Sequence, residues 1–209
     1  MSLVIVFLMQ AVGISLSGVL APGPMTAATL AAGAKSRHAG LLLALGHGIV
    51  EFPLMLLIMA GMGKIFQFPF VQNLIGFIGG GFLIYMAVGM FRNQGQNTND
   101  TEFSQSKSPL LTGIILTAGN PYFLLWWATI GLALASQALQ LGPLAFAIFA
   151  VIHWLCDLVW LEILSQVSFR GRIFLGPRSQ DRILLVCGIA LAIFGIRFVI
   201  LAGSSLAGL

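Results

Sequence analysis

Two pairs of ionisable residues with the same spacing stand within apolar stretches of the sequence. His47 and Glu51 are four residues apart, and so are His153 and Asp157. Residues four apart share one face of a helix, so each stretch would present an imidazole beside a carboxylate. A carboxylate inside a membrane is costly unless it is protonated or partnered, and an imidazole titrates near neutral pH. The spacing predicts two proton-carrying sites; the structural alternative is that each pair only pins its helix to a neighbour.

A proline-containing stretch near the N-terminus predicts a binding site. The run from Met1 to Ala34 carries no charge and contains Pro22-Gly23-Pro24. Each proline removes a backbone N–H and clashes with the preceding turn, so the helix is expected to break inside the membrane. Such a break is tolerated where it is buried in protein or lines a wet cavity. Pro24 would then begin a half-helix whose free N–H groups suit a substrate carboxylate.

A second break is predicted at Asn120-Pro121, in the fourth apolar segment. Both breaks lie roughly 17 Å from the expected cytoplasmic end of their segments, near the midplane of the membrane. Asn120 adds a hydrogen-bond donor and an acceptor at that depth. The predicted substrate-binding residues are Pro22, Gly23, Pro24, Met25, Thr26, Asn120 and Pro121.

The composition excludes a water-soluble protein. Hydrophobic residues make up 58% of the 209, charged residues make up 8%, and the mean hydropathy is +1.00. A soluble domain carries roughly 25% charged residues, so this chain lacks the polar surface needed in water. The net charge of +4 comes from basic residues clustered in loops. It therefore indicates membrane topology and contact with anionic lipid, and no nucleic-acid partner is expected.

The apolar segments fall into two similar halves. Each half places a break in its first segment and a His–carboxylate pair in its second, and three spans per half would insert the halves in opposite directions. We expect an all-α, polytopic membrane protein with six transmembrane helices, arranged as a 3+3 inverted repeat with broken helices 1 and 4. The segments are 3–34, 39–61, 70–91, 109–134, 143–168 and 182–203. The parts are a first three-helix repeat (1–91), a cytoplasmic polar linker (92–108) and a second three-helix repeat (109–209).

The basic residues predict the orientation. Eight of the ten fall in the connections after segments one, three and five, and the connection after segment two has only Lys64. Because cytoplasmic loops are rich in Lys and Arg, both termini are expected outside. The eight are Lys35, Arg37, Arg92, Lys107, Arg170, Arg172, Arg178 and Arg182.

Some residues within the spans have structural as well as functional interpretations. Arg197 could reach the outer interface or pair with an acid, and Glu162 could pair near the inner interface, so both are candidate charge partners. Gly76 and Gly80 form a GxxxG face, which predicts close helix packing. The tryptophans are interpreted as packing residues or interface anchors: Trp126, Trp127 and Trp154.

Several of these motifs together resemble the LysE/RhtB-type family of lysine exporters and amino-acid translocators. Leu20-Ala21-Pro22-Gly23-Pro24 looks like the early proline-glycine-proline signature of that family, and Ala39-Gly40 with Leu45-Gly46-His47-Gly48 resembles its glycine-spaced second helix. The run from Gly119 to Trp127 is similar to its asparagine-proline fourth helix. Asp157 matches a frequent fifth-helix aspartate, and Cys187-Gly188 fits the opening of helix six.

The resemblance implies a non-enzymatic secondary transporter in the prokaryotic plasma (inner) membrane. It implies export of amino acids or similar small solutes, driven by the proton gradient. The expected partners are the solute, protons and lipid; a homodimer is allowed, and no cofactor is expected. The coupling residues on this hypothesis are His47, Glu51, His153 and Asp157.

Other functions remain open on the sequence alone. A divalent-metal exporter could use His47, Glu51, His153 and Asp157 as ligands, because imidazoles and carboxylates suit such ions. A membrane redox enzyme of similar build would need paired cysteines in segments one and four, whereas Cys156 and Cys187 fall in segments five and six. A passive channel is also compatible with the sequence.

Overall fold

The computed structural model describes residues 3–21, 23–61, 63, 65, 68–92, 108–174 and 177–207. Every regular element among these residues is a helix, as predicted. Pro22 and residues 93–107 of the predicted linker lie outside the described residues. The helices are α1 (Leu3–Val19), α2 (Pro24–Gly33), α3 (Ala39–Met59), α4 (Pro69–Arg92), α6 (Pro109–Ala118), α7 (Pro121–Trp126), the π-helical turn η2 (Trp127–Gly131), α8 (Leu132–Gln140), α9 (Pro143–Phe174) and α10 (Pro177–Ala207).

Within the described residues, five helical segments are long and apolar enough to cross a membrane, and the bent pair α1–α2 makes up to six. The helices α1 and α2 meet at 76°, and α6 and α7 are separated by Gly119 and Asn120. Both predicted breaks are therefore confirmed. The predicted segment 109–134 ends too early, because α7, η2 and α8 together form a spanning helix from Pro121 to Gln140.

Proline fixes where most helices begin. Six helices start at a proline, where the missing N–H has no intrahelical partner to lose and the fixed φ suits a first turn. Pro53 is the exception among the described prolines and lies inside the continuous helix α3. The six helices are α2, α4, α6, α7, α9 and α10.

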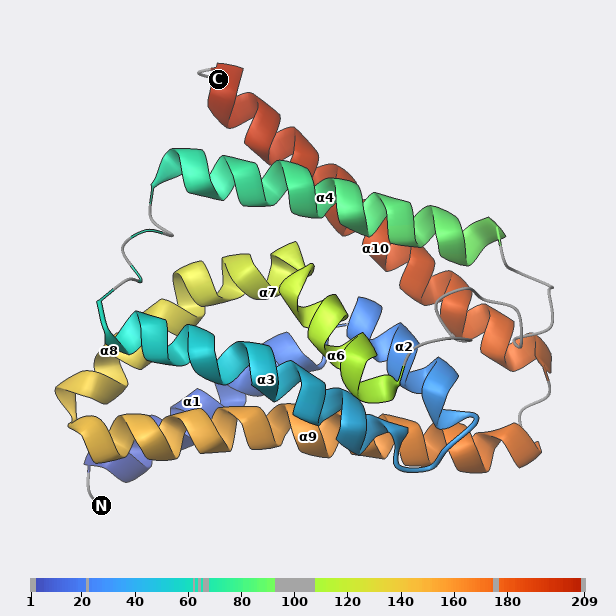
Figure 1. Cartoon of the computed structure of the whole chain (residues 1–209), viewed down its shortest axis with the longest axis horizontal. Coiled ribbons are helices and arrows are strands. Elements are labelled where there is room, and N and C mark those ends of the chain that lie inside the picture. The colour runs from blue at the N-terminus through green and yellow to red at the C-terminus, as the bar shows by residue number, and fades with distance from the viewer. Residues whose placement is uncertain are drawn as a thin grey trace.

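The second and third helices of each half run opposite to, and beside, their counterparts in the other half (Figure 1). The second helices, α3 and α9, pack together, and so do the third helices, α4 and α10. The broken helices cross over: α1 and α2 pack on α9 of the second half, and α6 packs on α3 of the first half. This reciprocal packing agrees with the predicted inverted repeat.

Glycines allow the closest helix crossings. A Cβ at Gly46 of α3 would collide with the Leu110 carbonyl of α6, and a Cβ at Gly80 of α4 would lie 2.8 Å from the Gly195 carbonyl oxygen of α10. Close backbone approach of this kind stabilises helix pairs where lipid provides no hydrophobic drive for association. The predicted packing role of Gly80 in the GxxxG face is thus confirmed.

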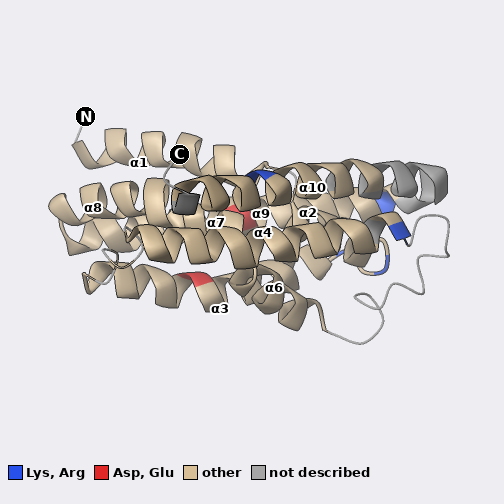
Figure 2. Ribbon diagram, turned by 90° about the horizontal axis from the view of Figure 1, so that it is seen from above, with Lys and Arg blue, Asp and Glu red and all other residues tan. Residues whose placement is uncertain are grey.

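Basic residues are concentrated at one end of the bundle (Figure 2). Most Lys and Arg residues in the described chain lie at the end opposite the N-terminus, near the α2–α3 connection. Acidic residues within the bundle lie nearer its middle. This end of the bundle is therefore suited to water and headgroups, and the acids in the middle require a protein environment.

Candidate functional site

A cavity of about 110 Å³ lies where both helix breaks meet α3 and α9. Its walls combine apolar side chains with the ionisable groups of the second helix of each half. Most of the predicted site residues line it: Gly23, Pro24, Met25, Thr26, His47, Glu51, Asn120, His153 and Asp157. The two breaks and the two His–carboxylate pairs thus form one site, although up to 134 residues separate them in the chain.

The first break leaves a helix N-terminus without a side-chain cap. Gly23 is the N-cap residue of α2, with an extended backbone and no side chain that could accept a hydrogen bond. The first turn begins at Pro24, and the N–H groups of Met25 and Thr26 have no partner among the described residues. Unsatisfied N–H groups and the helix dipole make this end electropositive, and it lines the cavity.

The second break differs because it supplies its own cap. The Asn120 side-chain oxygen accepts a hydrogen bond from the Tyr122 N–H at 3.1 Å, and Pro121 follows as the first residue of α7. Pro121 is fully buried and contacts Gly79 of α4, so it holds the helix rather than lining the cavity. Of the two helix N-termini at the breaks, that of α2 is the one available to a ligand.

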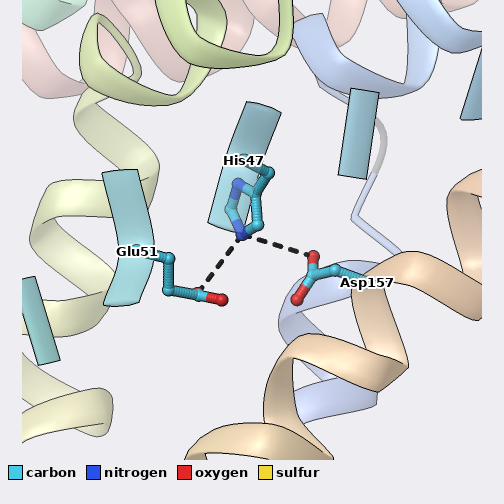
Figure 3. Close-up of side chains that lie close together, drawn as sticks. All are labelled: His47, Glu51 and Asp157. Atoms are coloured by element: carbon cyan, nitrogen blue, oxygen red, sulfur yellow. Dashed lines mark ion pairs between the residues drawn. The ribbon is translucent and has the colours of Figure 1, made fainter. Parts of the chain in front are cut away.

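A cluster of buried imidazoles, the buried Glu51 and the partly buried Asp157 occupies the wall formed by α3 and α9. His47 Nε2 lies 3.2 Å from Glu51 Oε1 and 3.8 Å from Asp157 Oδ1 (Figure 3). His153 Nε2 approaches the same Glu51 Oε1 at 3.2 Å. Glu51 is 1% exposed, so its charge is balanced by these groups rather than by water. The two pairs predicted from spacing are therefore one cluster.

Each histidine is held by a hydroxyl of the opposite half. His47 Nδ1 is 2.9 Å from Thr117 Oγ1 of α6, and His153 Nδ1 is 2.7 Å from Ser15 Oγ of α1. The Thr117 hydroxyl donates its single proton to the Gly113 carbonyl at 2.7 Å. His47 Nδ1 must therefore donate to Thr117, which leaves Nε2 as the nitrogen that faces the two carboxylates.

Aromatic rings complete the cluster. The Trp127 indole N–H donates to Glu51 Oε1 at 3.2 Å. The His153 ring is stacked on Trp126 at 5.0 Å between centroids and meets Trp127 edge-on at 5.2 Å. The sequence interpretation of these tryptophans as packing residues missed the bond to Glu51. It also missed Ser15 and Thr117. Both are hydroxyl residues in the helix that precedes a break, and this shared position is the sequence feature that could have identified them.

Two predicted charge partners lie away from the cavity. Glu162 bonds His38 Nδ1 at 2.8 Å and accepts from the Leu41 N–H at 3.1 Å, so it joins α9 to the start of α3. Arg197 is exposed on α10, and no ion pair joins it to an acid within the described residues. Neither residue lines the cavity.

The cluster also contains a donor set that could hold a metal ion. His47, Glu51 and Asp157 each offer one ligand atom, and these atoms lie within 4.8 Å of one another. One imidazole nitrogen with two carboxylate oxygens suits a borderline divalent ion. Glu51 Oε1 is already an acceptor for Trp127, whereas Oε2 has no hydrogen-bond partner among the described residues.

Broken helices that meet buried ionisable groups in a central cavity define the class of the protein: a polytopic membrane transporter of the discontinuous-helix type. The family model of the LysE type translocators matches residues 16–202, and the chain belongs to this family. The predicted family resemblance is thereby confirmed, and the chain is a multi-pass transporter. Comparisons with curated proteins and with solved structures find no match.

Proposed function

We propose that this transporter exports amino acids or similar small solutes across the prokaryotic plasma membrane in exchange for protons. The observation that carries the proposal is the meeting of an uncapped helix N-terminus and a buried His–carboxylate cluster in one cavity. The first suits an anionic group, and the second suits a cationic group or a proton.

Substrate binding uses the uncapped end of α2 and the opposite wall. The N–H groups of Met25 and Thr26 would receive a carboxylate, since no Lys or Arg of the described part of the chain lines the cavity to do so. Asn120 would add its side-chain N–H₂, because its oxygen is already bonded to Tyr122. An ammonium group would lie toward Glu51 and Asp157.

Coupling follows from the shared protonation of the cluster. His47 Nε2, Glu51 Oε1 and Asp157 Oδ1 are all acceptors when none of them carries a proton, and they would then repel one another. A proton held among them relieves this repulsion. An arriving ammonium group provides an alternative positive charge, so it releases the proton, which is the exchange an antiporter needs.

Movement between access states would act on contacts that join the two repeats. His47 of the first repeat contacts Thr117 and Asp157 of the second, and His153 of the second contacts Ser15 and Glu51 of the first. Rocking one repeat against the other must change these distances. The protonation state of the cluster would therefore bias the balance between the two states.

A divalent-metal exporter is the second candidate. It is favoured by the 4.8 Å grouping of ligand atoms from His47, Glu51 and Asp157. In that case the ion is the transported cargo, and the α2 N-terminus has no anionic group to receive. An amino acid would therefore use both the α2 N-terminus and the His–carboxylate cluster, whereas a metal ion would use the cluster alone.

A ligand screen on the purified protein in detergent distinguishes them. The thermal unfolding midpoint is measured with each L-amino acid and with Mn²⁺, Co²⁺, Ni²⁺ and Zn²⁺. A ligand at about 100 times its dissociation constant adds roughly 2.7 kcal/mol to the stability of the folded state. We expect stabilisation by one or more amino acids and none by the metals.

Carboxylate variants serve as matched controls for this screen. Glu51→Gln should weaken the response to amino acids without abolishing it, because the α2 N-terminus and Asp157 still line the cavity, whereas Glu162→Gln, with the same chemical change outside the cavity, should leave the response unchanged. Stabilisation by a divalent ion alone, lost in Glu51→Gln, would instead support the metal exporter.

A further inference from the structure

Two neighbouring tryptophans differ in how their indole N–H groups are used. The N–H of Trp127 is bonded to Glu51 Oε1 at 3.2 Å. Trp126 is 8% exposed, and its N–H has no hydrogen-bond partner among the described residues. A buried donor without a partner costs roughly 1–3 kcal/mol, and such groups are few in native proteins. Packing alone would be served equally well by phenylalanine, so the unused N–H requires another explanation.

The unused donor lies in the wall of the cavity near the helix break. A Cβ at Gly18 would be 2.9 Å from Trp126 Nε1, so the nitrogen faces the last turn of α1, where glycine leaves room. Trp126 and Gly18 both line the cavity, as do Met25 and Thr26 with their unpartnered N–H groups. Three N–H donors with no acceptor among the described residues thus border one space.

One acceptor in the same cavity is also unused. Glu51 Oε2 is buried and has no hydrogen-bond partner among the described residues. Because Oε1 of the same carboxylate is bonded to Trp127, the free oxygen is the one left for a cationic group. Within the described residues, the cavity therefore offers unused donors and an unused carboxylate oxygen, which matches a solute with both an acceptor end and an amine end.

We propose that Trp126 Nε1 donates a hydrogen bond to the carboxylate end of the transported solute and acts with the α2 N-terminus to select solutes that carry both a carboxylate and an amine. This inference rests on the proposed function, because it assigns one end of the solute to a residue of that same site. Trp126 is on this view a specificity-determining residue, and Trp127 positions Glu51 at the amine end.

The test compares amino acids with amines that lack the carboxylate. Dissociation constants are measured by calorimetry for L-alanine, L-threonine, L-leucine and L-lysine. They are also measured for their decarboxylated forms: ethylamine, 1-amino-2-propanol, 3-methylbutylamine and cadaverine. The variant Trp126→Phe keeps an aromatic ring beside His153 and removes the N–H. We expect it to weaken binding of the amino acids by about ten-fold or more and to leave the amines within about two-fold.

Two further variants make the result specific. Trp127→Phe should weaken amino acids and amines alike, because it releases Glu51 at the amine end. Gly18→Ala keeps the indole but puts a methyl group against its nitrogen, so it should reproduce the selective loss. It also covers the case in which Trp126→Phe fails to fold.

Each contrary outcome has a separate meaning. Equal weakening of amino acids and amines by Trp126→Phe, or no effect on either, would overturn the role of Trp126 and leave the proposed function standing. If the unmodified protein binds none of the amino acids, the amino-acid function itself fails, and the assignment of Trp126 fails with it.

Discussion

The two histidines of the cluster have the same spacing to a carboxylate but different hydrogen-bond constraints. Thr117 cannot donate to His47 Nδ1 while it donates to Gly113, so His47 must donate through Nδ1. Ser15 has no such second bond within the described residues, so it can donate to His153 Nδ1. His153 can then be neutral with a proton on Nε2, facing Glu51. On the proposed function, we therefore expect His47 to be the histidine that exchanges a proton with the carboxylates.

Removing the Thr117 hydroxyl should therefore alter the pH dependence of transport. In Thr117→Val the Nδ1–H of His47 loses its acceptor. This loss destabilises the doubly protonated imidazolium more than the neutral ring, because both N–H groups of the imidazolium need a hydrogen-bond acceptor. We expect the pH profile of transport in proteoliposomes to move toward lower pH by roughly one unit. The groups that face His47 are Glu51 on α3 and Asp157 and His153 on α9, and α6 contributes none that titrates. Thr117→Ser keeps the hydroxyl and should retain the original profile; an unchanged profile in Thr117→Val would assign the proton to another group.

The broken helices show what sequence patterns can predict about this site. The breaks were predictable because proline disfavours the interior of a helix and stands beside Gly23 or Asn120 at each of them, and their convergence followed from the repeat. The difference between them also follows from residue type, since Asn120 can cap its own helix and Gly23 has no side chain to do so.

The contacts of the tryptophans were not predictable in the same way. A π-helical turn begins at Trp127, and it changes the direction of the side chains relative to a regular α-helical period. Which indole reaches Glu51 depends on that local change and on how α7 packs against α3. Ser15 and Thr117 were missed for a related reason, because their partners lie in the opposite repeat.

The crossing of α3 and α6 should be sensitive to any side chain at Gly46. In Gly46→Val the new atoms would meet the Leu110 carbonyl and the backbone of Gly113, and neither can move without shifting α6. We expect a loss of stability of about 2–3 kcal/mol or more, measured as a lower thermal unfolding midpoint in detergent. Gly81→Ala is the matched control, since nothing lies within 4 Å of its Cβ position, and it should be neutral or slightly stabilising. Equal tolerance of both substitutions would mean that the two helices are not in close contact.

On the scale of the whole molecule, the charge distribution predicts the topology. The basic residues gather at the end of the bundle opposite the N-terminus, which the positive-inside rule assigns to the cytoplasm (Figure 2). In a chain with both native cysteines replaced, Gln140→Cys at the end of α8 should react with an impermeant maleimide added to intact cells. Ser36→Cys, in the α2–α3 connection at the opposite end, should react only after the cells are opened. Both side chains are exposed, so accessibility to water does not differ between them. The reverse labelling pattern would contradict the orientation with both termini outside.

On the proposed function, coupling belongs to the scale of the whole molecule, because the cluster joins the two repeats that are proposed to move against each other. Glu51→Gln and Asp157→Asn replace each carboxylate by a neutral group of the same shape, which resembles the protonated acid but cannot release a proton. Because the amide introduced by Glu51→Gln retains an oxygen that can accept from Trp127, this variant should remain folded and inserted. We expect both variants to lose accumulation of substrate against its gradient in proteoliposomes and to retain exchange of external for internal substrate.

Comparison of these two variants with Glu162→Gln tests whether the cluster carries the coupling proton or only holds helices together. This variant makes the same chemical change at a carboxylate that bonds His38 and Leu41 outside the cavity, so uphill accumulation and its pH dependence should persist. If Glu51→Gln and Asp157→Asn also accumulate substrate with the original pH dependence, the proton is carried elsewhere. The contacts of the cluster would then serve only to hold α3 and α9 together. Loss of both accumulation and exchange in folded protein would instead assign the two carboxylates to substrate binding alone. Retained exchange with lost accumulation is the result that identifies Glu51 and Asp157 as coupling residues, because only the step that needs a released proton has then failed.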